Sequence, residues 1–303
     1  MAKIAIVALG VSADRYFRVA EMSGNTSFLF DEVWVINGFG HVFACDRVFH
    51  MDDVRVQALR AKAGNKKVAN LLEWLRVTKI PVVTSRVLAK EPDLERLEEC
   101  KRIISILPVS RSEPNQPATE YERAKAELDT LEIEKELIDA GGFESLVEFP
   151  MQDVLNRFHA HPYFNNTVAY AIAMGALEGH DMTIYGADFW YPGQTLSNGQ
   201  ELVEHGRGCC EYWIGIAVSH GCNVNITGES TLLDSYKGSP LYGYDGRHLT
   251  AQINAATGMV DVVFKDIPLP SGQEMEARYY KGPPGMMSAD MASRENNFQR
   301  QAV

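Results

Sequence analysis

Short apolar runs that alternate with helical segments constrain the fold of this chain more than any other feature. The first run, KIAIVAL at residues 3–9, ends at Gly10 and suits a strand that is buried on both faces. Further strands are expected in DEVWVING, in CDRVFHMDD as far as Asp53, in IPVVTS, in ESLVEF, in MTIYGAD and in NVNITG. This alternation predicts an α/β fold with a doubly wound, mostly parallel, Rossmann-like sheet.

The alternation is interrupted once, and it stops well before the last residue. Residues 90–142 are rich in Glu, Lys and Arg, and they predict a charged helical insertion that can serve as a lid or as a contact between copies of the chain. Residues 241–303 are rich in Gly, Pro and Met and predict a partly irregular C-terminal extension. The expected nucleotide-binding core therefore comprises residues 1–89 and 143–240.

Composition excludes several classes of protein. A chain of 303 residues with 46% apolar residues can bury a large core. Its formal charge of -11 disfavours a broad grip on nucleic acid, which depends on many Lys and Arg contacts to phosphates. No apolar run approaches the roughly 20 residues that span a bilayer, and the first residues lack the layout of a signal peptide. We therefore expect a cytoplasmic protein.

The common catalytic fingerprints are missing from the sequence. The turn after the first strand, ALGVSADRYF, has a single glycine where a dinucleotide-binding protein would carry GxGxxG. A phosphate loop of the GxxxxGK[ST] type, a GxSxG nucleophile turn and an HExxH helix are likewise missing. These absences argue against NAD enzymes, P-loop kinases, serine hydrolases and zinc proteases.

Polar residues instead follow the expected strands at the edge where parallel sheets bind their ligands. Asn37 can pair with a base or a ribose, or it can simply form a turn before Gly38. Asp52 and Asp53 can hold Mg²⁺ beside a diphosphate, or they can cap the following helix. A second group sits where a helix begins and can cap it or hold a phosphate. The full set of strand-end and helix-start candidates is Gly10, Ser12, Asn37, Asp52, Asp53, Ser85, Asn165, Asn166, Thr167 and Asp188.

The segment after Asp188 supplies candidates for acid–base chemistry and for stacking. His205 is expected in a polar loop just ahead of a helix over residues 207–220, where it can titrate near neutral pH, and Arg207 follows it closely. A solvated loop histidine is the simpler interpretation. Trp190 and Tyr191 can stack on a base or a sugar, and the phenol of Tyr191 can donate to a departing phosphate, although core packing is the commoner use of such rings.

Three stretches carry a resemblance to a known family. They are ALGVSA followed by DEVWVIN and DRVFHMDD, then YFNNTVAYAIAMGALEGHDMTIYGADFWY, and finally EHGRGCCEYWIGIA. In this order they resemble the bacterial sialyltransferases and their relatives, the Maf-type flagellin glycosyltransferases and the hydroxymethylpterin pyrophosphokinases. The likeness covers roughly residues 1–85 and 145–235. The strings DRVFHMDD and GADF are also similar to those of tailed-phage proteins, which would place the chain in the cytoplasm of an infected bacterium.

The resemblance implies a glycosyltransferase that takes a sugar from a nucleotide-sugar donor, with CMP-sugars favoured. His205 falls where those transferases have their general base. The Gly-Asn-Gly-Pro-Ser turn of the family is reduced to Leu9, Gly10, Val11 and Ser12, so one nucleotide-contacting Asn is lost. The alternatives are a pyrophosphokinase or nucleotidyltransferase that uses Mg²⁺ on Asp52 and Asp53, and a non-catalytic protein that sequesters a nucleotide. No other cofactor is expected.

Overall fold

The computed structural model describes residues 1–24, 27–112, 117–189, 202–228, 230–233, 247–255, 258, 260–269 and 271–273. Their contacts divide the chain into two compact units, residues 1–232 and residues 233–303. The described part of the second unit contains an antiparallel hairpin of β8 (Arg247–Ile253) and β9 (Val260–Asp266). All the residues discussed below belong to the first unit.

Within the described residues of the first unit, seven strands form one parallel sheet, which confirms the predicted α/β fold class. The sheet has the order β5-β4-β3-β2-β1-β6-β7. The chain therefore runs outward from β1 as far as β5, then crosses back to place β6 on the other side of β1. The strands are β1 (Lys3–Val7), β2 (Glu32–Ile36), β3 (Arg47–Phe49), β4 (Val82–Thr84), β5 (Leu146–Glu148), β6 (Asp181–Tyr185) and β7 (Val224–Ile226).

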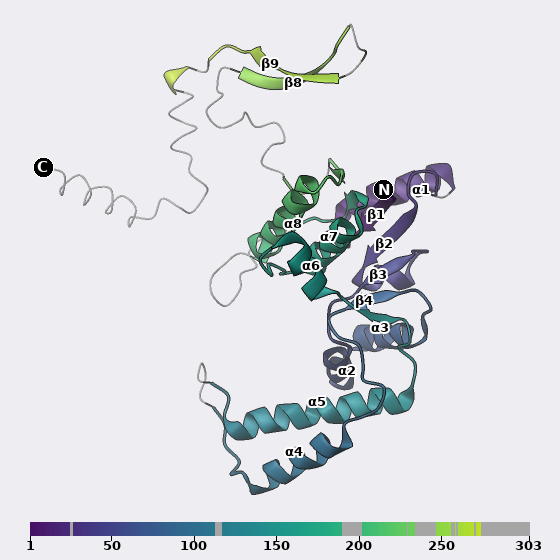
Figure 1. Ribbon diagram of the computed structural model, residues 1–303, viewed down its shortest axis with the longest axis vertical. Coiled ribbons are helices and arrows are strands. Elements are labelled where there is room, and N and C mark those ends of the chain that lie inside the picture. The colour runs from purple at the N-terminus through teal and green to yellow at the C-terminus, as the bar shows by residue number, and fades with distance from the viewer. Residues whose placement is uncertain are drawn as a thin grey trace, which may run out of the picture. The chain divides into compact units, whose positions relative to one another are not determined.

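Helices cover both faces of this sheet. Alternate residues of each buried strand point to opposite faces, so the sheet has one hydrophobic core on each side. Ile4 and Ile6 of β1 pack in one core, while Ala5 and Val7 pack in the other. The first core includes α7 (Thr167–Glu178) and α8 (Leu202–Ser219), with α6 (Met151–Phe158) beside them (Figure 1). The second core is covered by α1 (Asp14–Ser23), α2 (Val54–Lys62) and α3 (Lys66–Val77). The short helices η1 (Val11–Ala13) and η2 (Asn37–His41) follow β1 and β2.

The predicted insertion is a helical hairpin of α4 (Leu94–Ile106) and α5 (Glu120–Ala140), which lies beyond α2 in Figure 1. Ile133 and Leu137 of α5 pack in the second core, and the partly buried guanidinium of Arg55 adds a polar link to α2. Arg55 of α2 donates to Glu134 of α5 at 3.0 Å, and Glu134 is only 7% exposed. None of the described helices combines the length and the apolar character that crossing a membrane requires.

Candidate functional site

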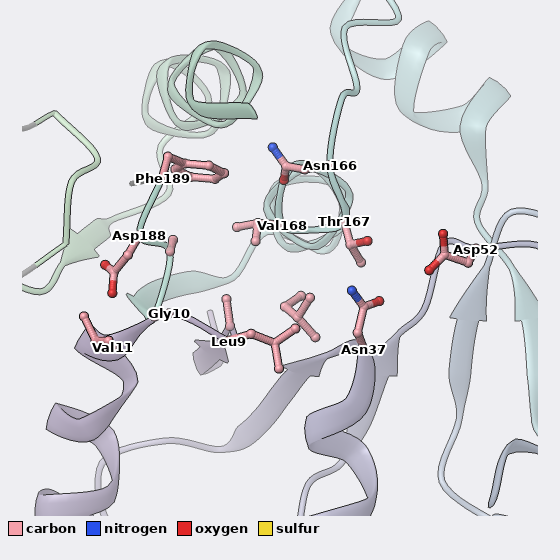
Figure 2. A pocket seen from close by; sticks show the side chains of 14 residues that line it. Leu9, Gly10, Val11, Asn37, Asp52, Asn166, Thr167, Val168, Asp188 and Phe189 are labelled. Atoms are coloured by element: carbon pink, nitrogen blue, oxygen red, sulfur yellow. The ribbon is translucent and has the colours of Figure 1, made fainter. Parts of the chain in front are cut away.

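A cavity of about 450 Å³ opens at the carboxyl ends of β1, β2 and β6, beside the first turn of α7. This is the point at which the strand order reverses, because β2 and β6 flank β1 on opposite sides. Open α/β sheets bind ligands at such switch points, and the volume lies in the range of small-molecule sites. Figure 2 shows Asn37 and Thr167 across from each other, with Asp52 beyond them and Asp188 at the other end.

Asp188 holds together the two loops that form one end of the cavity. Its Oδ2 accepts a hydrogen bond from the Ser12 N–H at 2.6 Å, and its Oδ1 accepts one from the Ser12 hydroxyl at 2.6 Å. The same hydroxyl accepts a hydrogen bond from the Gly186 N–H at 3.0 Å. Ser12 is only 4% exposed. Both predicted site residues are therefore near the cavity, but their polar atoms are used to fix the loops after β1 and β6.

The start of α7 is docked on α8 by two asparagine amides. Asn166 caps α7 by accepting from the Ala169 N–H at 3.1 Å, and its Nδ2 donates to the Gly206 carbonyl at 2.6 Å. Asn165 donates to the His205 carbonyl at 3.1 Å. Of the two roles that the sequence leaves open, capping is confirmed for Asn166, which also lines the cavity. The groups that α7 leaves for a ligand are the N–H groups of its first turn, at Thr167 and Val168, which the helix itself does not use.

Asn37 has two unusual properties at the end of β2. Its backbone adopts a left-handed conformation with φ of 51°, which Asn tolerates better than most residues. Its Oδ1 atom is fully buried and has no hydrogen-bond partner within the described chain. The side chain as a whole lines the cavity, so its amide is the polar group that β2 brings to a ligand there.

Other buried polar atoms without hydrogen-bond partners also lie at the carboxyl ends of the strands. Among the described residues, every buried side-chain polar atom without a partner belongs to a residue that ends or directly follows a strand. A buried polar group that lacks a partner costs about 1–3 kcal/mol unless water or a ligand satisfies it. The carboxyl edge is therefore the part of the molecule that most requires an additional binding partner. The atoms are Asn37 Oδ1, both ring nitrogens of His50, Thr84 Oγ1 and Thr227 Oγ1.

Asp52 and Asp53 have different surroundings. Asp52 is exposed and lines the cavity. Asp53 is the N-cap of α2 and accepts from the N–H and the guanidinium of Arg55. Burial raises the pKa of Asp53, but the hydrogen bonds and charge of Arg55 outweigh it and hold that pKa below its usual value. No three His, Cys, Asp or Glu side chains gather around a common point in the described parts of the chain.

The predicted loop around His205 is wrong, because α8 already begins at Leu202 and includes His205 and Arg207. The polar character of the segment suggests a loop, but two of its glycines allow close packing on this helix. A Cβ on Gly206 would lie 2.9 Å from the Phe189 ring, and one on Gly208 would lie 2.8 Å from the Tyr163 hydroxyl.

Arg207 and Ser85 do not line the cavity. Arg207 is near Glu211, with 3.8 Å between Nε and Oε1. Ser85 follows β4 directly, as predicted, but is exposed and does not line the cavity. The third strand was predicted to reach Asp53, but β3 ends at Phe49. Trp190 and Tyr191 lie outside the described residues.

Sequence reasoning missed the apolar wall of the cavity. Leu9, Val11, Val168 and Phe189 line it alongside the polar residues. Leu9 and Val11 are 52% and 87% exposed, which is unusual for large apolar side chains that directly follow a buried strand. Their position next to Gly10 was a usable signal, because apolar residues in a strand-end loop have no sheet to pack against and are available to a ligand.

His50 gives a testable pH dependence. Burial lowers its pKa below the usual 6.5, with the charge of Asp52 acting in the opposite direction. Below pH 6.5 the unfolded chain therefore binds a proton that the folded chain excludes, so stability falls as the pH decreases towards the folded-state pKa. For one proton the slope is at most about 1.4 kcal/mol per pH unit.

We expect His50→Phe, which fills a similar volume, to remove this slope and to leave stability near pH 7.5 unchanged or slightly higher. Urea denaturation of both proteins at pH 7.5 and pH 5 measures it. Equal slopes in the two proteins would show that His50 is not buried in the neutral form.

Comparisons of the chain with protein-family models, curated proteins and solved structures found no match. The family resemblance of the three stretches therefore stays a prediction.

Proposed function

We propose that the chain is a nucleotide-sugar-dependent glycosyltransferase that binds its donor in the cavity at the β1–β6 switch point. The observation that carries the proposal is the meeting of two complementary groups across that cavity. The first turn of α7 presents N–H donors at Thr167 and Val168, and the Asn37 amide, whose oxygen lacks a partner, lies across from Thr167. A nucleotide needs both, because its phosphate only accepts hydrogen bonds whereas its ribose and base also donate them.

The charge of the cavity favours a donor with few phosphates. Its described lining contains Asp52 and Asp188 but no Lys, Arg or His. The anion must therefore be held by the N–H groups and the positive end of the α7 dipole. Such a site suits the single phosphate of a CMP-sugar better than a triphosphate. The apolar residues Leu9, Val168 and Phe189 provide a surface for the base or the sugar ring.

The proposed reaction breaks the bond between the sugar's anomeric carbon and the phosphate oxygen, and joins that carbon to an acceptor hydroxyl. His205 takes the acceptor's proton, and the nucleotide leaves with both electrons of the broken bond. His205 does not itself line the cavity; it is in the first turn of α8, and its backbone carbonyl accepts from Asn165, which precedes the cavity residue Asn166. Asp188 acts by positioning, because both of its oxygens accept hydrogen bonds from Ser12.

The structure gives a reason to prefer this reaction to Mg²⁺-dependent pyrophosphoryl transfer. The second reaction was expected to use Asp52 and Asp53 together. Asp53 instead pairs with Arg55, which leaves Asp52 as the only one of the two carboxylates on the cavity. A single exposed carboxylate is a poor basis for a metal site unless the substrate supplies most of the ligands.

The experiment is a calorimetric titration with CMP, UDP, GDP, ADP and their sugar conjugates, each with and without Mg²⁺. We expect one nucleotide to bind without requiring the metal, and its sugar conjugate to be consumed when acceptors are supplied. Binding of the conjugate with no turnover would favour a sequestering protein. Binding that depends strictly on Mg²⁺ would contradict the proposal, as would the absence of binding by every nucleotide.

Asn37→Gly tests whether the Asn37 side chain contributes to nucleotide binding. Glycine accepts the left-handed backbone, and the change removes a buried oxygen that has no partner. We therefore expect unchanged or higher stability in urea denaturation, together with a Kd for the nucleotide that rises about threefold to tenfold, as the loss of one neutral hydrogen bond implies. A variant that loses stability and keeps its affinity would assign Asn37 a structural role instead.

A further inference from the structure

A second cavity, of about 460 Å³, lies at the opposite edge of the sheet. Among its lining residues are Asp31 and Asp46, which directly precede β2 and β3. It therefore opens at the amino ends of these strands, whereas the nucleotide cavity opens at carboxyl ends. In size the two cavities are nearly equal.

Four aromatic rings line this second cavity. Tyr16 and Phe17 of α1, together with Phe30 and Phe43, line it. The rings also support one another, since the Phe17 and Phe43 centroids are 5.2 Å apart in an edge-to-face arrangement and those of Tyr16 and Phe43 are 5.8 Å apart. This mutual packing fixes the rings in place and limits their collapse into the space.

Two carboxylates lie on the same cavity, and backbone hydrogen bonds hold them there. Asp31 accepts from the Lys3 N–H at 2.7 Å, and Asp46 accepts from the Val33 N–H at 2.7 Å. The described lining of this cavity includes no Lys, Arg or His. The thiol of Cys45, which also lines it, has its pKa raised to about 11 by burial and by the charge of Asp46. The cavity is therefore negative as well as aromatic.

We propose that this cavity binds a small organic cation, in which an ammonium group is carried on a compact apolar body. Ring faces attract cations by their quadrupole, and neighbouring carboxylates add attraction that does not depend on a fixed hydrogen-bond geometry. A bare metal ion fits the cavity less well, because it would need several oxygen ligands and would leave the rings without a partner. The site is independent of the proposed glycosyl transfer.

Choline and its uncharged isostere, in which carbon replaces the ammonium nitrogen, are the probes that test this proposal. Both are titrated into the full chain at low salt, and the aromatic resonances are followed by NMR. We expect choline to bind at least about fivefold more tightly than the isostere, because only the charged probe gains from the rings and the carboxylates. Equal affinities, or no shift of the resonances with either probe, would overturn the proposal.

Asp46→Asn separates the carboxylate's charge from its structural role, because the amide oxygen can still accept from the Val33 N–H. We expect it to weaken choline binding about threefold or more and to leave the isostere unaffected. Glu132→Gln, on the exposed side of α5, makes the same change in net charge elsewhere and should alter neither affinity. Equal weakening by the two variants would assign the effect to total charge and contradict a site at this cavity.

Discussion

Replacing Gly186 by alanine is expected to destabilise the protein by about 3 kcal/mol or more, the largest effect that any single methyl group should have near the site. Gly186 has φ of 68°, where an alanine costs roughly 1 kcal/mol in strain. In addition, the new Cβ would lie 2.2 Å from the Ala8 carbonyl oxygen and 2.9 Å from the Ala13 Cβ. The backbone of Ala8 cannot yield easily, since its N–H donates to the Tyr185 carbonyl at 2.8 Å. Relief of such a clash typically costs a further 1–3 kcal/mol.

Gly179 provides a matched control for this prediction. It ends α7 with φ of 72°, nearly the same as Gly186, and a Cβ there would meet nothing within 4 Å. Gly179→Ala should therefore show the strain alone, about 1 kcal/mol in urea denaturation. The difference between the two variants isolates the close approach of β1 and β6. Equal losses would mean that the loops after these strands adjust freely, and the site would then be less rigid than the structure indicates.

Thr167→Pro is expected to weaken nucleotide binding by about tenfold to a hundredfold while the fold is retained. Thr167 is the first residue of α7, where proline is favoured because the helix does not use that N–H. The preceding Asn166 has φ of -160° and ψ of 163°, an extended conformation that proline tolerates before it. The change thus removes a donor from the cavity at little structural cost. Loss of a hydrogen bond to a charged group is worth about 1.5–3 kcal/mol.

Thr167→Val is the control, because it keeps the N–H and removes only the hydroxyl. The ratio of the Kd values of the proline and valine variants, measured by calorimetry with the nucleotide that binds best, reports the contribution of the N–H group. Both variants should denature near the wild-type urea concentration, since the Asn166 cap to Ala169 is untouched. If the proline variant binds as tightly as the valine variant, the phosphate does not lie at the start of α7.

The order of strands and helices was predictable because it follows from the local pattern of apolar residues along the sequence. The positions of Asn37, Asp52 and Asp188 near one cavity followed from the same logic, since each comes within three residues of the carboxyl end of a strand in one parallel sheet. The hydrogen-bond partner of each polar side chain could not be predicted. Asn166 and Asp188 carry the right side chains for a ligand, but their amide and carboxylate are already engaged by Gly206 and Ser12.

The errors share a physical cause, which is that partners far away in the sequence decide the conformation and the contacts. The polar residues up to His205 predict a loop, yet α8 begins at Leu202, and Phe189 and Tyr163 lie against it at Gly206 and Gly208. Asp53 was expected at the end of a strand, and its pairing with Arg55 at the start of α2 explains why the strand ends sooner. No local pattern encodes these contacts, whereas the unpaired oxygen of Asn37 could only be found from the fold.

The guanidinium of Arg55 joins the helical hairpin to the edge of the cavity at the carboxyl ends of the strands. It pairs with Glu134 on α5 and with Asp53, which directly follows the rim residue Asp52. A tilt of the hairpin must either stretch this bridge or pull on the segment that carries Asp52. A molecule that binds the outer faces of α4 and α5 is therefore coupled, through Arg55, to the segment that carries Asp52, and the hairpin is a place from which the shape of this cavity can be changed at a distance.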